Sequence, residues 1–207
     1  MTEVEGVIKF VCEHEPMALA PHDIAELRAW REVLLRLGML GQDASRYGGY
    51  GFGNVSMRTG DGFLVSGSQT GHLGNPGLEA YSRVVSWDLG AGRIVSQGEV
   101  KPSSESLTHA AIYELSPSIR WVFHAHAPEI WRGAEQRSIA ATPPDVAYGT
   151  PAMAAAVETL FPEHPSTGIF AMGGHEDGII AFGETADAAG EQLIYGFVRA
   201  KTAEFSP

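Results

Sequence analysis

The spacing of apolar residues along the chain predicts four helices. From Leu27 to Leu37 these residues recur every three or four positions, which would give a helix one apolar face. Pro and Asp just before this segment suit a helix start, and Gly38 or Gly41 would end it. The same spacing recurs in three later segments, which are residues 107–115, 151–160 and 185–201.

Short apolar runs separated by turn residues predict strands between these helices. The predicted strand regions are a hairpin over residues 53–68, a second hairpin pairing 83–87 with 93–96, and strands at 119–126, 168–172 and 178–182. A purely parallel sheet would need a helix-length crossover after nearly every strand. We therefore expect an α/β protein with a mixed, largely antiparallel sheet, built as a single domain over residues 1–207.

Composition and charge narrow the classes of function. The formal net charge is −11 and only 14 residues are Lys or Arg, which argues against a nucleic-acid-binding surface. No stretch approaches the roughly 18 apolar residues of a membrane span, and the first residues lack the pattern of a secretion signal. With Cys12 as the only cysteine, we expect a spectator thiol, no disulfide and a cytoplasmic protein.

The segment His124-Ala125-His126 ends the predicted strand 119–126. Because side chains alternate along a strand, both imidazoles should face one side of the sheet, with Trp121 and Phe123 on the other. Two such nitrogens can share a metal ion, although two polar residues at a strand end explain the pattern equally well.

A third histidine, His175, follows Gly173-Gly174 between two predicted strands. A hairpin tip there could carry its imidazole to the histidine pair, or leave it as an exposed loop residue. Three imidazoles would suit zinc, and also iron, cobalt or nickel.

Glu105 stands in Lys101-Pro102-Ser103-Ser104-Glu105, at the start of the helix predicted over 107–115. An acidic residue there can simply complement the helix dipole, and His109, four residues later on the same helix face, could donate a hydrogen bond to it. Near a metal, the same carboxylate could move a proton to or from carbon.

Five short motifs occur in one order: Gly53-Asn54-Val55-Ser56, Pro102-Ser103-Ser104-Glu105, His124-Ala125-His126, Tyr148-Gly149-Thr150 and Gly174-His175. With them, the chain resembles the class II aldolase/adducin family over roughly residues 24–200. The resemblance implies a three-layer α/β/α fold and a homotetramer with active sites at subunit interfaces. It also implies a divalent metal, zinc by expectation, on His124, His126 and His175, with Glu105 as acid/base.

The resemblance further assigns Asn54, Ser103 and Ser104 to the binding of a substrate phosphate. The turn from Ser66 to Gly71, which contains Ser68, could cradle an anion through its backbone amides. It reads Gly67-Ser68-Gln69 where the family usually has Pro-Ser-Gly or Pro-Thr-Gly. A second departure is Glu176-Asp177 directly after His175, where the family usually has glycine.

The resemblance therefore predicts a metal-dependent lyase of the aldolase type. It would act on a small hydroxy-carbonyl or sugar-phosphate-like compound through a metal-stabilised enediolate, with Glu105 as acid/base. A dehydratase, epimerase or decarboxylase would use the same site, and a non-catalytic adducin-like interaction module is a further alternative. A cupin-like metal protein is disfavoured because Glu129 lies too near His126 for the usual spacing.

Overall fold

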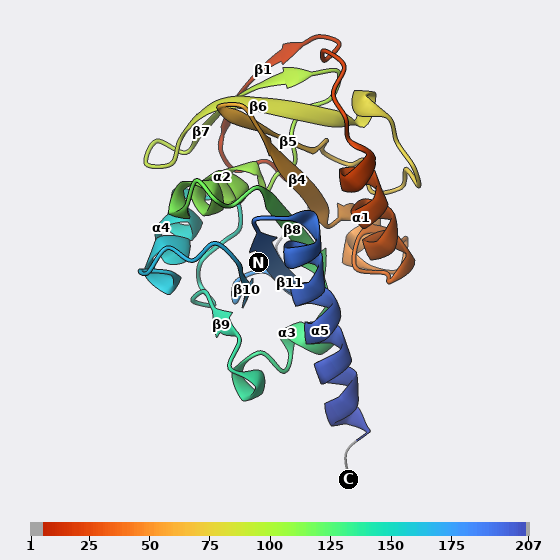
Figure 1. Ribbon diagram of the computed structural model, residues 1–207, viewed down its shortest axis with the longest axis vertical. Helices are drawn as coiled ribbons and strands as arrows, with labels where there is room; N and C mark the ends of the chain where they lie inside the picture. Colours follow the sequence, from red (N-terminus) through yellow and green to blue (C-terminus); the bar gives the residue numbers. More distant parts are fainter. Residues whose placement is uncertain (1–5, 206–207) are drawn as a thin grey trace.

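Figure 1 shows the computed structural model, which describes residues 6–205. The longer strands are β1 (Val11–Pro16), β4 (Asn54–Thr59), β5 (Gly62–Ser66), β6 (Tyr81–Asp88), β7 (Arg93–Gly98), β8 (Trp121–His126), β10 (Gly168–Ala171) and β11 (Gly178–Gly183). The α-helices are α1 (Ala25–Arg36), α2 (Ser106–Leu115), α3 (Pro128–Trp131), α4 (Pro151–Leu160) and α5 (Ala186–Glu204). The two-residue strands are β2 (Gly41–Gln42), β3 (Gly51–Phe52) and β9 (Ala140–Ala141).

Within residues 6–205, nine strands form one sheet in the order β1-β7-β6-β5-β4-β8-β11-β10-β9, and β2 pairs with β3 separately. Two neighbouring pairs are parallel, β1 with β7 and β9 with β10. The other neighbours run antiparallel. The predicted mixed, mainly antiparallel sheet is confirmed.

Helices cover both faces of this sheet (Figure 1). On one face, Leu107 of α2 and Val157 of α4 belong to the same buried cluster as Val122 of β8. On the other, Leu34 of α1 and Leu193 of α5 join Phe123 of β8. Adjacent residues of β8 thus enter opposite layers, as strand geometry requires. The three-layer α/β/α fold is confirmed.

The predicted helices and hairpins are present, with ends shifted by a few residues. The largest local difference is β1, which the apolar pattern did not predict. Its sequence, VCEHEP, contains two acids and a proline and is mostly exposed, so it has little intrinsic strand signal. Pairing with β7 at the sheet edge creates this strand.

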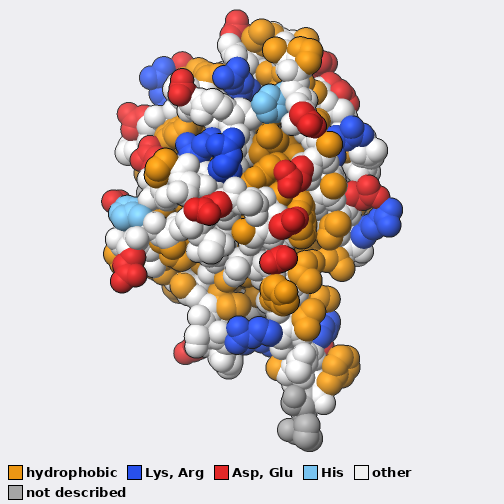
Figure 2. Space-filling view, viewed as in Figure 1, with side chains coloured by type: hydrophobic (Ala, Val, Ile, Leu, Met, Phe, Trp, Pro, Cys, Tyr) orange, Lys and Arg blue, Asp and Glu red, His pale blue; other side chains and the backbone are white. Residues whose placement is uncertain are grey.

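Four expectations from the sequence concern a membrane span, a basic surface, the single cysteine and a secretion signal. In the described part of the chain, no helix is both long and apolar enough to cross a membrane. On the face drawn in Figure 2, basic side chains are scattered among acidic ones and form no continuous basic stripe. Cys12 is partly buried, with Sγ 3.9 Å from Ser96 Oγ, and burial raises the pKa of its thiol. The expectation about a secretion signal concerns residues 1–5 first of all, which lie outside the described residues.

Candidate metal centre

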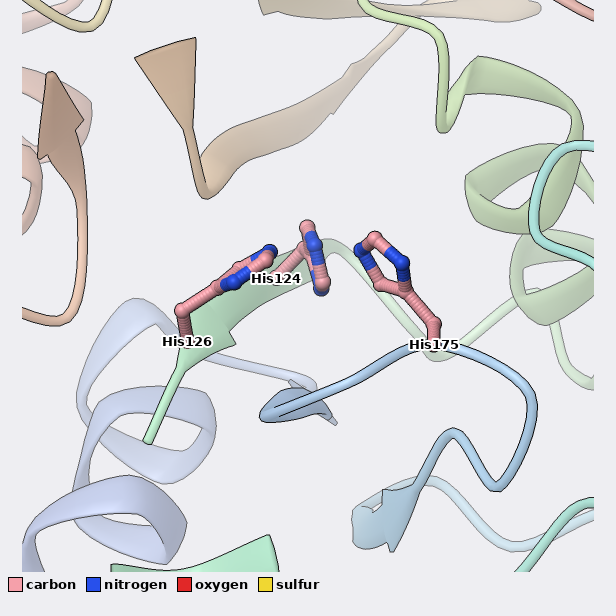
Figure 3. A group of neighbouring side chains, drawn as sticks. All are labelled: His124, His126 and His175. Carbon is pink, nitrogen blue, oxygen red and sulfur yellow. The ribbon is translucent and has the colours of Figure 1, made fainter. Parts of the chain in front are cut away.

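His124, His126 and His175 meet in the buried interior. Each offers a ring nitrogen, and these nitrogens lie within 4.8 Å of one another. Figure 3 shows His124 and His126 side by side on the end of β8, with His175 reaching toward them from the loop between β10 and β11. The predicted meeting of the three imidazoles therefore occurs.

Local backbone geometry brings His175 to the strand. The loop closes through hydrogen bonds from His175 N to Met172 O at 3.1 Å and from Gly178 N to His175 O at 3.0 Å. A Cβ on Gly178 would lie 2.6 Å from Cδ2 of His175, so only glycine lets the imidazole lie against β11. Gly178 is also paired with His126 across β8 and β11.

The histidine nitrogens fit a divalent cation. Burial is the main cause that holds the pKa of His124 and of His126 well below 6.5, so both rings are neutral and carry a lone pair. Nδ1 of His124 donates to Ile179 O at 3.3 Å, which leaves the lone pair on Nε2. This Nε2 is buried and has no hydrogen-bond partner among residues 6–205. Three imidazole nitrogens are the donor set of many catalytic zinc sites.

The side chain of Glu105 lies beside the three histidines, at the N-terminus of α2. It is 1% exposed, and its Oε1 lies 3.9 Å from Nε2 of His175. This separation is too long for a hydrogen bond, and it is about twice the ~2.0 Å length of a zinc–ligand bond. Ser103 Oγ accepts from Glu105 N at 3.2 Å, which holds the carboxylate at the helix start.

The expected hydrogen bond between the side chains of Glu105 and His109 is not formed. His109 Nδ1 instead bonds to Ser56 Oγ at 2.7 Å, and His109 Nε2 has no hydrogen-bond partner among the described residues. Ser56 Oγ also lies 2.8 Å from Tyr113 OH. Ser56 on β4 therefore takes the hydrogen bond of the His109 ring that the sequence assigned to Glu105.

The predicted anion-binding residues line one small cavity. Asn54, Ser68, Ser103 and Ser104 all border it, together with uncharged residues of the neighbouring loops: Gly6, Gly51, Gly53, Gly67, Gln69, Thr70 and Gly71. The cavity adjoins the histidines because Asn54 is paired with His124 across β4 and β8. Asn54 is 6% exposed, and its Oδ1 has no hydrogen-bond partner within residues 6–205.

Aromatic side chains that the sequence interpretation did not select surround the histidines. Tyr47 and Phe52 have ring centroids 4.4 and 5.4 Å from that of His126. Tyr148, which the sequence places in a motif and offers as a proton donor or, more plainly, as a packed aromatic, lies 4.6 Å from the His175 ring. The glycine-dense stretch from Tyr47 to Asn54 favours a loop that enters a strand, and no pattern in it singles out Tyr47.

Comparison with known proteins identifies the family of this chain. Residues 42–200 match the model of the class II aldolase and adducin N-terminal domain, so the chain belongs to the class II aldolase/adducin family. All the motifs, from Gly53-Asn54 to Gly174-His175, fall within this match.

Among curated proteins, the chain is similar to methylthioribulose-1-phosphate dehydratase of Gluconacetobacter diazotrophicus. The two are 35% identical over 75 residues, which are 36% of this chain and 34% of that protein. The match thus spans about a third of the relative's length.

Solved structures of the same fold are more distant in sequence. L-fuculose-1-phosphate aldolase from Thermus thermophilus superposes with a TM-score of 0.60 at 18% identity, over 87% of this chain and 92% of that one. A sugar-phosphate aldolase from Thermotoga maritima gives a TM-score of 0.65 at 13% identity, over 86% and 92%. At these identities the likeness shows the fold alone.

Proposed function

We propose that this protein is a metal-dependent lyase acting on a small hydroxy-carbonyl compound that carries a phosphate or a similar anion. The observation that carries the proposal is the convergence of His124, His126 and His175 on one point beside the buried carboxylate of Glu105. A divalent cation held there, zinc by preference, supplies a Lewis acid for the substrate's oxygens. Three buried imidazoles gathered at one point argue against a non-catalytic adducin-like module, which would need no such cluster.

Glu105 is the candidate for proton transfer. Its carboxyl group is removed from bulk water, and its backbone is fixed by Ser103 Oγ, so the group is held in place before the reaction. In aldol cleavage, Glu105 would take the proton of the hydroxyl that becomes the new carbonyl and return a proton to the carbon left when the carbon–carbon bond breaks. In loss of water, it would remove the proton from the carbon next to the carbonyl.

The uncharged cavity beside Asn54 supports an anionic substrate group. The chain carries a net charge of −11, yet none of the residues bordering this cavity is acidic. The side chain of Asn54 and the hydroxyls of Ser68, Ser103 and Ser104 can donate hydrogen bonds there, as phosphate oxygens require. Since Asn54 pairs with His124, the anion and the reacting carbonyl would be a few atoms apart in one molecule.

Carbon–carbon cleavage is our first candidate, and loss of water is the second. The first follows from the family's motifs. The second is favoured by the 35% identity to methylthioribulose-1-phosphate dehydratase, although only 75 residues are aligned. Both reactions need a proton moved at the carbon beside a carbonyl, so the same residues serve either.

Product analysis separates these candidates. Purified protein loaded with zinc, cobalt or manganese is incubated with ketose and methylthioketose 1-phosphates, and products are identified by mass spectrometry. Two carbonyl fragments indicate aldol cleavage, and a product lighter by one water indicates a dehydratase. Removal of the metal by a chelator should abolish turnover and its return should restore it. The proposal would be contradicted if the protein took up none of these ions and turned over no substrate.

A further inference from the structure

The hydroxyl of Tyr47 joins two loops that lie far apart in the sequence. Tyr47 belongs to the 3-10 turn Tyr47–Gly49, between β2 and β3, whereas Asp177 ends the loop that carries His175. Tyr47 OH donates to Asp177 Oδ2 at 2.8 Å. Asp177 is the second of the two acids, Glu176-Asp177, that directly follow His175.

Asp177 is tied to the strand end at His126 as well. Its backbone carbonyl accepts from Ala127 N at 2.8 Å, directly after His126. One residue therefore links the loop that carries His175, the end of β8 and, through its carboxylate, the turn at Tyr47.

The Tyr47 ring contacts a candidate metal ligand directly. It meets the His126 imidazole edge-on, with centroids 4.4 Å apart and planes at 69°. The Phe52 ring packs against both, with its centroid 5.0 Å from that of Tyr47 and 5.4 Å from that of His126. His126 is 1% exposed, so these rings account for part of its enclosure. Rotation of the imidazole would require Tyr47 to move.

Both partners adopt a backbone conformation that side chains other than glycine rarely take. The φ angle is 48° at Tyr47 and 63° at Asp177. Such conformations persist where surrounding contacts enforce them, and they cluster at functional sites. Arg46 adds a further contact, because its Nη2 donates to Tyr47 OH at 3.0 Å, so the hydroxyl bonds to both Arg46 and Asp177.

We propose that Tyr47 and Asp177 are a positioning pair that sets the placement of His126 relative to His175 and thereby the affinity and geometry of the metal centre. The inference rests on the proposed function, since it presumes that the histidines bind a cation. Partners that orient metal ligands typically contribute roughly 10–100-fold to metal affinity. Neither residue needs to touch the substrate for this role.

Metal binding measured without turnover tests the pair. Zinc affinity is determined by competition with a chromophoric chelator, and the visible spectrum of bound Co²⁺ reports ligand geometry. For Tyr47→Phe, which keeps the ring and removes the hydroxyl, we expect zinc affinity to fall roughly 10–100-fold and the Co²⁺ bands to shift. Asp177→Ala should do the same.

Two further variants isolate the hydrogen bond. Asp177→Asn keeps an oxygen that can accept from Tyr47, so it should retain more affinity than Asp177→Ala. The double variant Tyr47→Phe/Asp177→Ala should lose little beyond either single change, because both remove one interaction. Matched controls are Tyr50→Phe, an exposed tyrosine three residues on, and Glu176→Gln, the neighbouring exposed acid; both should bind zinc as the unaltered protein does.

Failure of the positioning role can be distinguished from failure of the proposed lyase function. Unchanged zinc affinity and Co²⁺ spectrum in Tyr47→Phe and Asp177→Ala, with or without a lower melting temperature, would overturn the positioning role and leave the proposed lyase intact. Equal losses in the controls would overturn it too. If the unaltered protein binds no cation, the lyase proposal and this inference fall together.

Discussion

The Oε1 atom of Glu105 lies 3.9 Å from Nε2 of His175, although one residue begins α2 and the other occupies the loop between β10 and β11. Both side chains are almost fully buried, at 2% and 3% exposure. An acid and an imidazole so placed face a common point at a separation too long for a hydrogen bond, which is the arrangement expected of a proton-transfer group beside a metal ligand.

Glu105 should be needed for turnover and not for metal binding. Glu105→Gln preserves size and removes the ability to exchange a proton, so turnover should fall by about 100-fold or more, in line with the usual contribution of general acid–base catalysis. Metal content, measured by atomic emission, should stay close to that of the unaltered protein. Turnover within a factor of two of the original would remove the assigned role.

Loss of a histidine ligand should remove the metal. His124→Ala leaves two imidazoles, so metal content after purification and dialysis should fall to near zero. Because a ligand that binds only the folded state stabilises it, a chelator should lower the melting temperature of the original protein but not that of the variant. The exposed His22→Ala is the control and should keep its metal. Full metal content in His124→Ala would contradict the site.

Substitution of Asn54 should lower kcat/KM far more for phosphorylated substrates than for phosphate-free ones. A hydrogen bond to a charged group contributes about 1.5–3 kcal/mol, so Asn54→Ala should lower kcat/KM roughly 10–100-fold for a sugar phosphate. The phosphate-free analogue should be affected much less. Asn75→Ala, at an exposed asparagine that accepts from Arg28, serves as the control. Equal losses for both substrates would place the anion elsewhere.

Buried His109 makes stability depend on pH. Burial lowers the pKa of His109 to about 3, below its ordinary value of 6.5. Between these values the unfolded chain binds the proton and the folded one does not, so the contribution is complete above pH 6.5 and is lost as pH falls toward 3. One such group changes the free energy of unfolding by up to about 1.4 kcal/mol per pH unit.

Urea denaturation of metal-free protein at several pH values measures this dependence. His109→Gln cannot take up the proton, so its slope between about pH 6.5 and about pH 4 should be smaller by about 1.4 kcal/mol per pH unit. An identical slope in both proteins would show that His109 is not held neutral by the fold.

Exposed apolar side chains on α5, and at Phe205 directly after it, predict self-association. Tyr195 is 62% exposed, Val198 52% and Phe205 84%. Figure 1 shows the C-terminal end of this helix projecting beyond the sheet. We expect a homotetramer, so light scattering should give four times the 22.1 kDa of one chain. Val198→Glu should weaken the assembly, and a clean monomer of the unaltered protein would contradict the expectation.

Much of the fold could be predicted because secondary structure follows local periodicity. The helix from Ala25 to Arg36 and the hairpin of β4 and β5 depend on residues only a few positions apart. β1 could not be predicted, because its polar sequence becomes a strand only through its neighbour β7.

The candidate site likewise has a part that local sequence predicts and a part that depends on tertiary contacts. That His124 and His126 share one face of a strand follows from the local sequence alone, since side chains alternate wherever that strand lies. The contacts of His175 and Glu105 with this pair, the bond from His109 to Ser56 and the bond from Tyr47 to Asp177 all depend on the tertiary fold. The physical reason is that a buried polar group bonds to whichever partner the sheet order and loop closures bring within reach, and distance along the chain does not encode this.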